Sequence, residues 1–228
     1  MSNPYSPFAE GTFQPQAPPP KRPAFKAWHI IVLAVGGGLL AVLLACGGLL
    51  YVGMTGISSR EPTDEERQAV ITATDLAAYG AEPERLDERE VWNTKRNLDG
   101  TLEIEYEYDQ DLAPGDDDTL AVLSTVELHH SDSSARESFG MMISAYKIGF
   151  GVSGVQSREQ PHRMAGVDQS HFSLILNDGQ NPVGNMVVVR AGKRVHGLLV
   201  IGVYFDDPAT LEAILRPTIE RSATLPAR

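Results

Sequence analysis

The stretch from Ala27 to Ile57 contains no Asp, Glu, Lys or Arg, and it constrains the rest of the chain more than any other feature. An α-helix rises about 1.5 Å per residue, so about 20 apolar residues cross the ~30 Å hydrocarbon layer of a bilayer. The core of the stretch, residues 29–51, is long enough to do so with some tilt. We therefore predict a transmembrane helix over residues 27–57.

Charges on the two sides of this stretch differ in sign. The preceding residues carry Lys21, Arg22 and Lys26 against Glu10, a net charge of +2, which leaves −13 of the whole-chain −11 for residues 58–228. Basic residues close to a span favour the cytoplasmic side. We therefore predict a single-pass cell-membrane protein with a cytoplasmic N-terminus and an acidic extracytoplasmic domain.

The first 26 residues are rich in proline and poor in large apolar side chains. Such a segment cannot bury enough apolar surface to offset the entropy of folding, so we predict a disordered cytoplasmic tail over residues 1–26. The tail begins with Asn3-Pro4-Tyr5-Ser6-Pro7, which resembles the starts of uncharacterised single-pass proteins of the bacterial envelope. That resemblance implies an envelope location and nothing about activity.

A lipid anchor is the alternative to a permanent span. The segment Leu43-Leu44-Ala45-Cys46 resembles a lipobox, in which cleavage before Cys46 and lipidation of its sulfur would tether the mature protein. Two features favour the span instead. Leu44 replaces the small residue usual at that position, and residues 47–57 stay apolar where a lipoprotein continues with a polar linker. Both alternatives place residues 58–228 outside and tethered.

Small residues recur along the predicted span at Gly37, Ala41 and Ala45. Small side chains every four residues let two helices approach closely, so this face is a candidate for self-association of the chain in the membrane. The alternative is the general abundance of Gly and Ala in spanning helices.

Composition excludes several functions for residues 58–228. A net charge of −13 repels phosphate backbones, so we expect no nucleic-acid partner. Because Cys46 is the single cysteine of the chain, the external domain has no disulfide, no thiol nucleophile and no thiolate metal ligand.

Hydrophobic periodicity predicts an α+β domain. Thr63 and Glu66 form a capping box for a first helix that ends at Gly80. A second helix follows Ser131, and a third begins at Asp206-Asp207-Pro208. Six strands are predicted between them, at 86–97, 101–108, 120–130, 170–176, 183–190 and 195–205.

The resulting order is α-βββ-α-βββ-α, with links short enough for antiparallel pairing. We expect an antiparallel sheet of about six strands covered by helices. Over residues 62–222 this order resembles the Mog1/PsbP-like α/β/α sandwiches of envelope lipoproteins. The resemblance implies a fold and transfers no site residue.

Three local motifs match known sites in their letters but not in their context. Residues 149–154 match G-x-G-x-x-G, but a helix precedes them where a dinucleotide site needs a strand. Ser144 and Lys147 match S-x-x-K, but the S-D-N and K-T-G elements are missing from the sequence. The acidic loop 109–118 lacks the Gly and terminal Glu of an EF-hand. We therefore predict no cofactor and no catalytic residue.

Histidines offer a further metal hypothesis. Glu127 and His129 share one face of a predicted strand, and other histidines occur at 130, 162, 171 and 196. None has a spacing that fixes ligand geometry, so we predict no metal site.

These observations favour a non-catalytic, membrane-anchored protein whose external domain binds an envelope protein or ligand. One alternative is a tethered hydrolase built from Asp168, His171 and Ser173, which lie close together around one strand start. Another is a small-molecule-binding lipoprotein with a pocket between sheet and helix.

Overall fold

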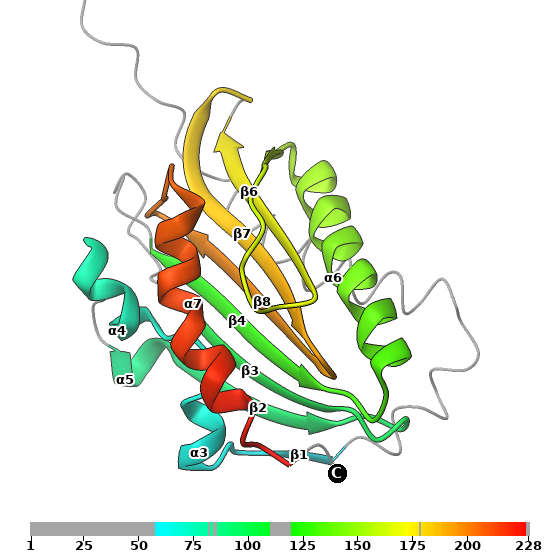
Figure 1. The fold of residues 1–228 in the computed structure, drawn as a ribbon. Coiled ribbons are helices and arrows are strands. Elements are labelled where there is room, and N and C mark those ends of the chain that lie inside the picture. Colours follow the sequence, from blue (N-terminus) through cyan, green and yellow to red (C-terminus); the bar gives the residue numbers. More distant parts are fainter. Residues whose placement is uncertain (1–57, 82, 84–85, 110–119, 178, 227–228) are drawn as a thin grey trace, which may run out of the picture.

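A computed structural model describes residues 58–81, 83, 86–109, 120–177 and 179–226. Within them the chain forms one antiparallel sheet of eight strands in the order β1-β2-β3-β4-β8-β7-β6-β5 (Figure 1). The strands are β1 (Ser58–Arg60), β2 (Glu90–Arg96), β3 (Leu102–Asp109), β4 (Ala121–Leu128), β5 (Gln156–Gln160), β6 (Gln169–Asn177), β7 (Asn181–Ala191) and β8 (Arg194–Ile201).

Helices cover both faces of this sheet. They are α3 (Asp64–Arg67), α4 (Ala73–Leu76), the 3-10 turn η1 (Ala77–Tyr79), α5 (Leu86–Arg89), α6 (Asp132–Ser153) and α7 (Pro208–Ser222). The short N-terminal helices and α7 pack on one face, and α6 packs on the other along β5, β7 and β8 (Figure 1). The arrangement confirms an antiparallel α+β domain.

Side-chain alternation divides the core into two layers. On β3, Leu102, Ile104 and Tyr106 are buried in the layer beneath α7, whereas the glutamates between them point to the opposite face. Beneath α6 a second layer joins Phe139 and Phe150 to apolar residues of β7 and β8. The period of two in the sequence therefore assigns the faces of β3 correctly.

The number of strands differs from the six predicted. β1 has only three residues, too few to give a pattern, and β5 is a polar edge strand with the sequence QSREQ. Helix α6 continues to Ser153 and ends at Gly154, whose φ of 74° is left-handed, so the glycines of the G-x-G-x-x-G match form a helix C-terminus.

A single helix from Thr63 to Gly80 is also wrong, although its capping box is confirmed. The chain leaves the helical path after α3 and starts α4 with a second capping box at Thr72. Backbone groups just before α4 and at its first residue bond to the sheet, since the Ile71 N–H donates to Ser124 Oγ at 2.9 Å and the Ala73 N–H donates to the Tyr106 hydroxyl at 3.0 Å. These tertiary hydrogen bonds replace a helical turn.

No helix among the described residues is long and apolar enough to cross a membrane. The predicted tail 1–26, the span 27–57 with Gly37, Ala41, Ala45 and Cys46, and most of the acidic loop lie outside the described residues.

Candidate functional site

Helix α6 covers only part of its face of the sheet. On the β2–β4 part, Val91 is 55 % exposed, and the side chains of Lys95 and Glu105 are 32 % and 23 % exposed. We call this part the open face. Its members, which share one side by strand register, are Val91, Asn93 and Lys95 of β2, Glu103, Glu105 and Glu107 of β3, and Leu123, Thr125 and Glu127 of β4.

Four carboxylates define the open face, and we call them the glutamate ladder: Glu103, Glu105, Glu107 and Glu127. Three of them alternate along β3, where side chains on one face repeat at about 7 Å. The fourth, Glu127, stands directly opposite Glu103 on β4. The ladder thus concentrates negative charge on two neighbouring central strands.

Basic side chains compensate little of the negative charge of the glutamate ladder. Lys95 Nζ lies 3.3 Å from Glu105 Oε2, and this is the one ion pair with a lysine or arginine that the described residues place on the open face. Burial raises the pKa of Glu103 to about 7; Lys95 opposes this shift, while Glu105 and Glu127 add to it. Burial and the neighbouring Glu105 and Asp109 likewise raise the pKa of Glu107. The ladder therefore carries like charges that repel one another.

A buried hydroxyl adjoins the centre of the ladder. Thr125 stands opposite Glu105 in the strand register, is only 8 % exposed, and its Oγ1 is closed to solvent. The Tyr146 hydroxyl lies nearby, over Gly197, where the missing side chain lets α6 approach the sheet. Burial raises the pKa of Tyr146, and a hydrogen bond with Thr125 opposes this shift, so the two hydroxyls meet beneath α6, out of reach of solvent.

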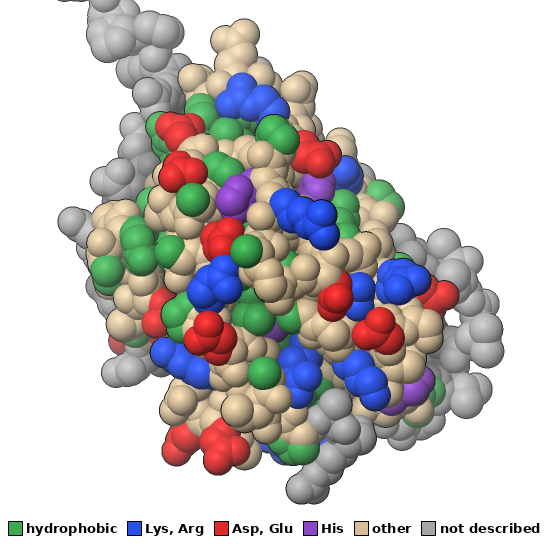
Figure 2. Space-filling model, viewed as in Figure 1, with side chains coloured by type: hydrophobic (Ala, Val, Ile, Leu, Met, Phe, Trp, Pro, Cys, Tyr) green, Lys and Arg blue, Asp and Glu red, His purple; other side chains and the backbone are tan. Residues whose placement is uncertain are grey.

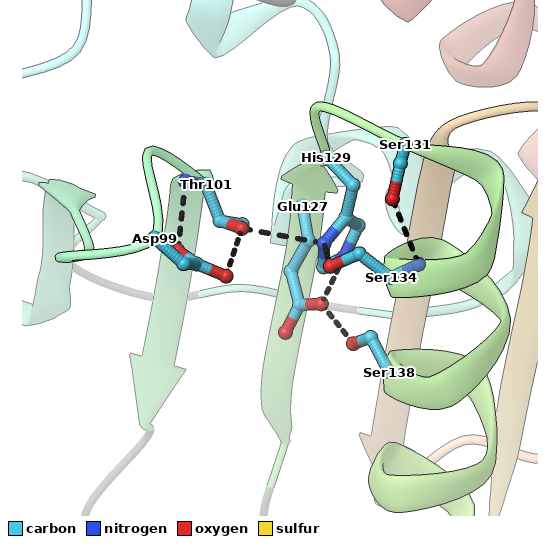
Figure 3. A network of polar contacts seen from close by, with 7 residues as sticks. All are labelled: Asp99, Thr101, Glu127, His129, Ser131, Ser134 and Ser138. Atoms are coloured by element: carbon cyan, nitrogen blue, oxygen red, sulfur yellow. Dashed lines mark hydrogen bonds and ion pairs between the residues drawn. The ribbon is translucent and has the colours of Figure 1, made fainter.

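A polar network closes one end of the open face (Figure 3). His129 Nε2 lies 2.9 Å from Glu127 Oε2, and its Nδ1 lies 3.0 Å from Ser134 Oγ and 3.3 Å from Thr101 Oγ1. Ser138 donates a short hydrogen bond to the same Glu127 oxygen. The network joins the β2–β3 turn, the end of β4 and the first turns of α6.

The direction of these hydrogen bonds follows from their chemistry. An ionised Glu127 carboxylate only accepts, so His129 Nε2 carries the proton and Nδ1 accepts. Thr101 donates its hydroxyl proton to Asp99, so the donor to Nδ1 is Ser134. Burial raises the pKa of the Asp99 carboxyl, but hydrogen bonds from the Thr101 N–H and hydroxyl outweigh it and hold that pKa below its usual range.

This carboxylate–imidazole–hydroxyl order also occurs in serine hydrolases, where it activates the nucleophile. Here His129 is only 4 % exposed, so its imidazole is closed to a substrate from solvent. We interpret the network as structural. It fixes the rotamer of Glu127 and ties α6 to the sheet beside the open face.

Of the three residues of the hydrolase alternative, the structure brings two together. Ser173 Oγ lies 3.0 Å from His171 Nε2. Asp168 instead accepts from the Gly192 N–H at 2.7 Å and pairs with Arg190 at 3.4 Å. The carboxylate on the other side of His171 is Glu159, 3.9 Å from Nδ1.

Accessibility argues against catalysis at this serine. Ser173 is 1 % exposed beneath α6, so a substrate carbonyl has no path to its hydroxyl without movement of the helix. Burial lowers the pKa of His171, which favours the neutral ring that a buried serine–histidine pair requires.

Two further histidines pair with side chains within the fold. His162 pairs with Glu212 at 2.8 Å, and His196 bonds to Ser222 inside the core, where burial lowers the pKa of His196 to about 3. The described part of the chain contains no group of three or more His, Cys, Asp or Glu side chains arranged to hold a metal ion.

A pocket of about 340 Å³ lies where the β5–β6 connection meets α6, lined in part by Phe139, Arg163 and Met164. Its volume suits a small ligand. Two of its polar side chains are committed to Arg190, which bonds Gln169 at 2.6 Å and pairs with Asp168. It offers fewer uncommitted polar groups than the open face.

The α7 side of the molecule shows no comparable concentration of charge. Figure 2 shows Lys and Arg side chains interspersed with Asp and Glu there, with hydrophobic groups scattered singly. Three of the four carboxylates of the open face are by contrast aligned along β3.

Comparison with known proteins finds no matching family model, no matching curated protein and no matching solved structure. The resemblances to single-pass envelope proteins and to Mog1/PsbP-like domains therefore stay predictions.

The raised pKa of Glu103 predicts a pH dependence of stability. Because the folded state binds this proton more tightly than the unfolded state, whose Glu pKa is near 4.5, the contribution is fully present below pH 4.5 and is lost as pH rises towards 7. In Glu103→Gln we expect the urea midpoint of the chain in non-ionic detergent to exceed wild type at pH 8 by more than at pH 5. Glu65→Gln, an exposed residue of α3, is the control. Parallel pH curves for Glu103→Gln and wild type would contradict the assignment.

Proposed function

We propose that this chain is a non-catalytic, single-pass membrane protein that presents an acidic extracytoplasmic domain and binds another envelope protein through the open face. The apolar residues 27–57 and the change from +2 to −13 across them support the anchor and its orientation. Residue 58, where the described domain begins, follows this stretch directly, so the tether is short. Lipidation at Cys46 is the alternative anchor and leaves the domain on the same side.

The glutamate ladder is the observation that carries the binding function. Its carboxylates are partly exposed and exceed the positive charge around them, so a partner that supplies basic side chains relieves their mutual repulsion. Exposed Val91 and half-buried Leu123 add apolar area on the same face. A protein surface with basic groups on an apolar base matches this combination.

A hydrolase is less well supported. Ser173 is buried, and the imidazole of the Glu127–His129–Ser134 order is closed from solvent. The open face, in contrast, needs no rearrangement to meet a partner.

Site-specific photo-crosslinking of the full chain in its native membrane tests this proposal. With a photoreactive residue in place of Val91, we expect a discrete adduct with one envelope protein. The adduct should disappear when Glu103, Glu105 and Glu107 are all changed to Gln, because the charge attraction is lost.

The matched control is the same photoreactive residue at Tyr79, which is 42 % exposed on the opposite face of the sheet. We expect no adduct there. Equal adducts at Val91 and Tyr79, or an adduct at Val91 that survives the triple substitution, would refute binding through the open face.

A further inference from the structure

Helix α6 packs on β5, β7 and β8 with one side and exposes the other, which we call the α6 outer face (Figure 1). Its exposed members recur every three or four residues: Glu137, Gly140, Met141, Ser144, Lys147, Ile148 and Gly151. Met141 is 65 % exposed and Ile148 49 %, which places two of the six exposed large apolar side chains of the described residues on this one helix. The outer side of a surface helix is ordinarily charged or polar, but no charged residue lies between positions 137 and 147.

Glycine on the α6 outer face has no cause within one copy of the chain. A Cβ added at Gly140 or Gly151 would meet no atom within 4 Å, so neither site is crowded. Glycine inside a helix loses more backbone entropy on folding than alanine does, so alanine would suit these positions better in an isolated copy. Small side chains let a second helix approach closely. The two glycines therefore point to a helix that packs on this face from outside the copy.

Charge complementarity identifies that helix. Glu137 and Lys147 are exposed and have no ion-pair partner among the described residues. In a parallel pair of identical α6 helices, each charge would face its own counterpart and repel it. In an antiparallel pair related by a two-fold axis at residue 142, Glu137 lies level with Lys147 of the second copy, because both are five positions from the axis. A two-fold contact of this kind forms the ion pair twice.

The same axis also suits the uncharged middle of the α6 outer face. Gly140 and Ser144 are each two positions from residue 142, so the glycine of one copy lies level with the serine of the other. Met141 is one position from the axis and meets Met141 of the second copy, which removes its exposed side chain from water. One register therefore brings together opposite charges, small residues and apolar groups.

We propose that the α6 outer face binds the same face of a second copy of this chain, with the two helices antiparallel and Glu137 of each copy paired with Lys147 of the other. The contact uses none of the glutamates of the ladder, so it goes beyond the proposed binding function and does not depend on it.

Cysteine crosslinking of the full chain in non-ionic detergent tests the proposal. Cys46 is first changed to Ser, and a single cysteine then replaces Met141, next to the two-fold axis. With a short bis-maleimide we expect a covalent dimer, because the two cysteines face each other across the contact. The matched control is Ala213→Cys in the same background, at an exposed position of α7. We expect the yield of dimer at position 141 to exceed that of the control about tenfold.

Charge reversal in the Met141→Cys chain tests the antiparallel register. Glu137→Lys and Lys147→Glu should each lower the dimer yield about tenfold, because like charges then face each other between the copies. The double variant Glu137→Lys/Lys147→Glu places opposite charges level again and should restore the yield. Both positions are exposed, so circular dichroism of each variant should match the parent chain.

Three results would overturn the proposal. The first is equal crosslinking at positions 141 and 213. The second is a dimer at position 141 whose yield is the same in both single charge reversals as in the parent chain, which is the result expected if copies associate through residues 27–57 instead. The third is a double variant that crosslinks no better than the single variants, since the loss in those would then have a cause other than charge pairing.

Discussion

Changing Gly184 to alanine is expected to lower the free energy of unfolding by about 3 kcal/mol or more. A Cβ at this position in β7 would lie 2.0 Å from the Val200 carbonyl oxygen and 2.9 Å from Ile201 Cδ1. The carbonyl belongs to the backbone of β8, so it can move only if the β7–β8 pairing shifts. Gly184 also pairs with Ile175 where the β6–β7 register shifts, a place where the strand path is tightly constrained.

The control is Gly140→Ala on α6, where no atom lies within 4 Å of the added Cβ. There alanine should raise the free energy of unfolding by about 0.5 to 1 kcal/mol, because glycine loses more backbone entropy in a helix. Urea denaturation of both variants measures the contrast. A stable Gly184→Ala protein would show that the β7–β8 spacing is wrong.

Removing the side chain of Asn185 is expected to cost about 2 to 4 kcal/mol. Asn185 is fully buried, accepts from the Phe205 N–H at 2.7 Å and donates to the Phe205 carbonyl at 3.1 Å. In Asn185→Ala the Phe205 N–H loses this partner inside the core, while its carbonyl keeps only a 3.5 Å contact from Gln160. Hydrogen exchange at the Phe205 amide should therefore accelerate.

Asn93→Ala provides the comparison. Asn93 accepts one hydrogen bond, from Ser59 at 2.8 Å, at the surface, so its loss should cost under about 1 kcal/mol. If the two asparagine variants unfold at the same urea concentration, the two hydrogen bonds between Asn185 and the Phe205 backbone contribute nothing to the free energy of unfolding.

The sequence allowed prediction of those elements whose residues carry their own signal. Along β3 the alternation of apolar residues and glutamates determines both the strand and its two faces. The strand β5 gives no such signal, because QSREQ is polar on both sides and is held only by β6. Around α4, hydrogen bonds that backbone N–H groups donate to Ser124 and Tyr106 decide the backbone path, and no local sequence pattern indicates them.

The candidate site likewise has features that the local sequence predicts and features that depend on tertiary packing. That glutamates 103, 105 and 107 share a face follows from their spacing, but their exposure depends on where α6 lies across the sheet. The nearness of His171 and Ser173 was correctly anticipated, since residues two apart on a strand share a face. Asp168 precedes that strand and points towards Arg190 and Gly192. Its orientation depends on these residues at the β7–β8 turn, which are distant from it in the sequence.

The strand order has a consequence for how this domain folds. β1 to β4 and β5 to β8 are two meanders of neighbouring strands, and the β4–β8 seam joins them. The closest pair on that seam, Leu128 and Arg194, lies 66 residues apart in the chain, whereas the ends of β7 and β8 pair at Ala191 and Arg194. Closing the long loop is the larger entropic cost, so the seam rather than either meander sets the rate at which the sheet is completed.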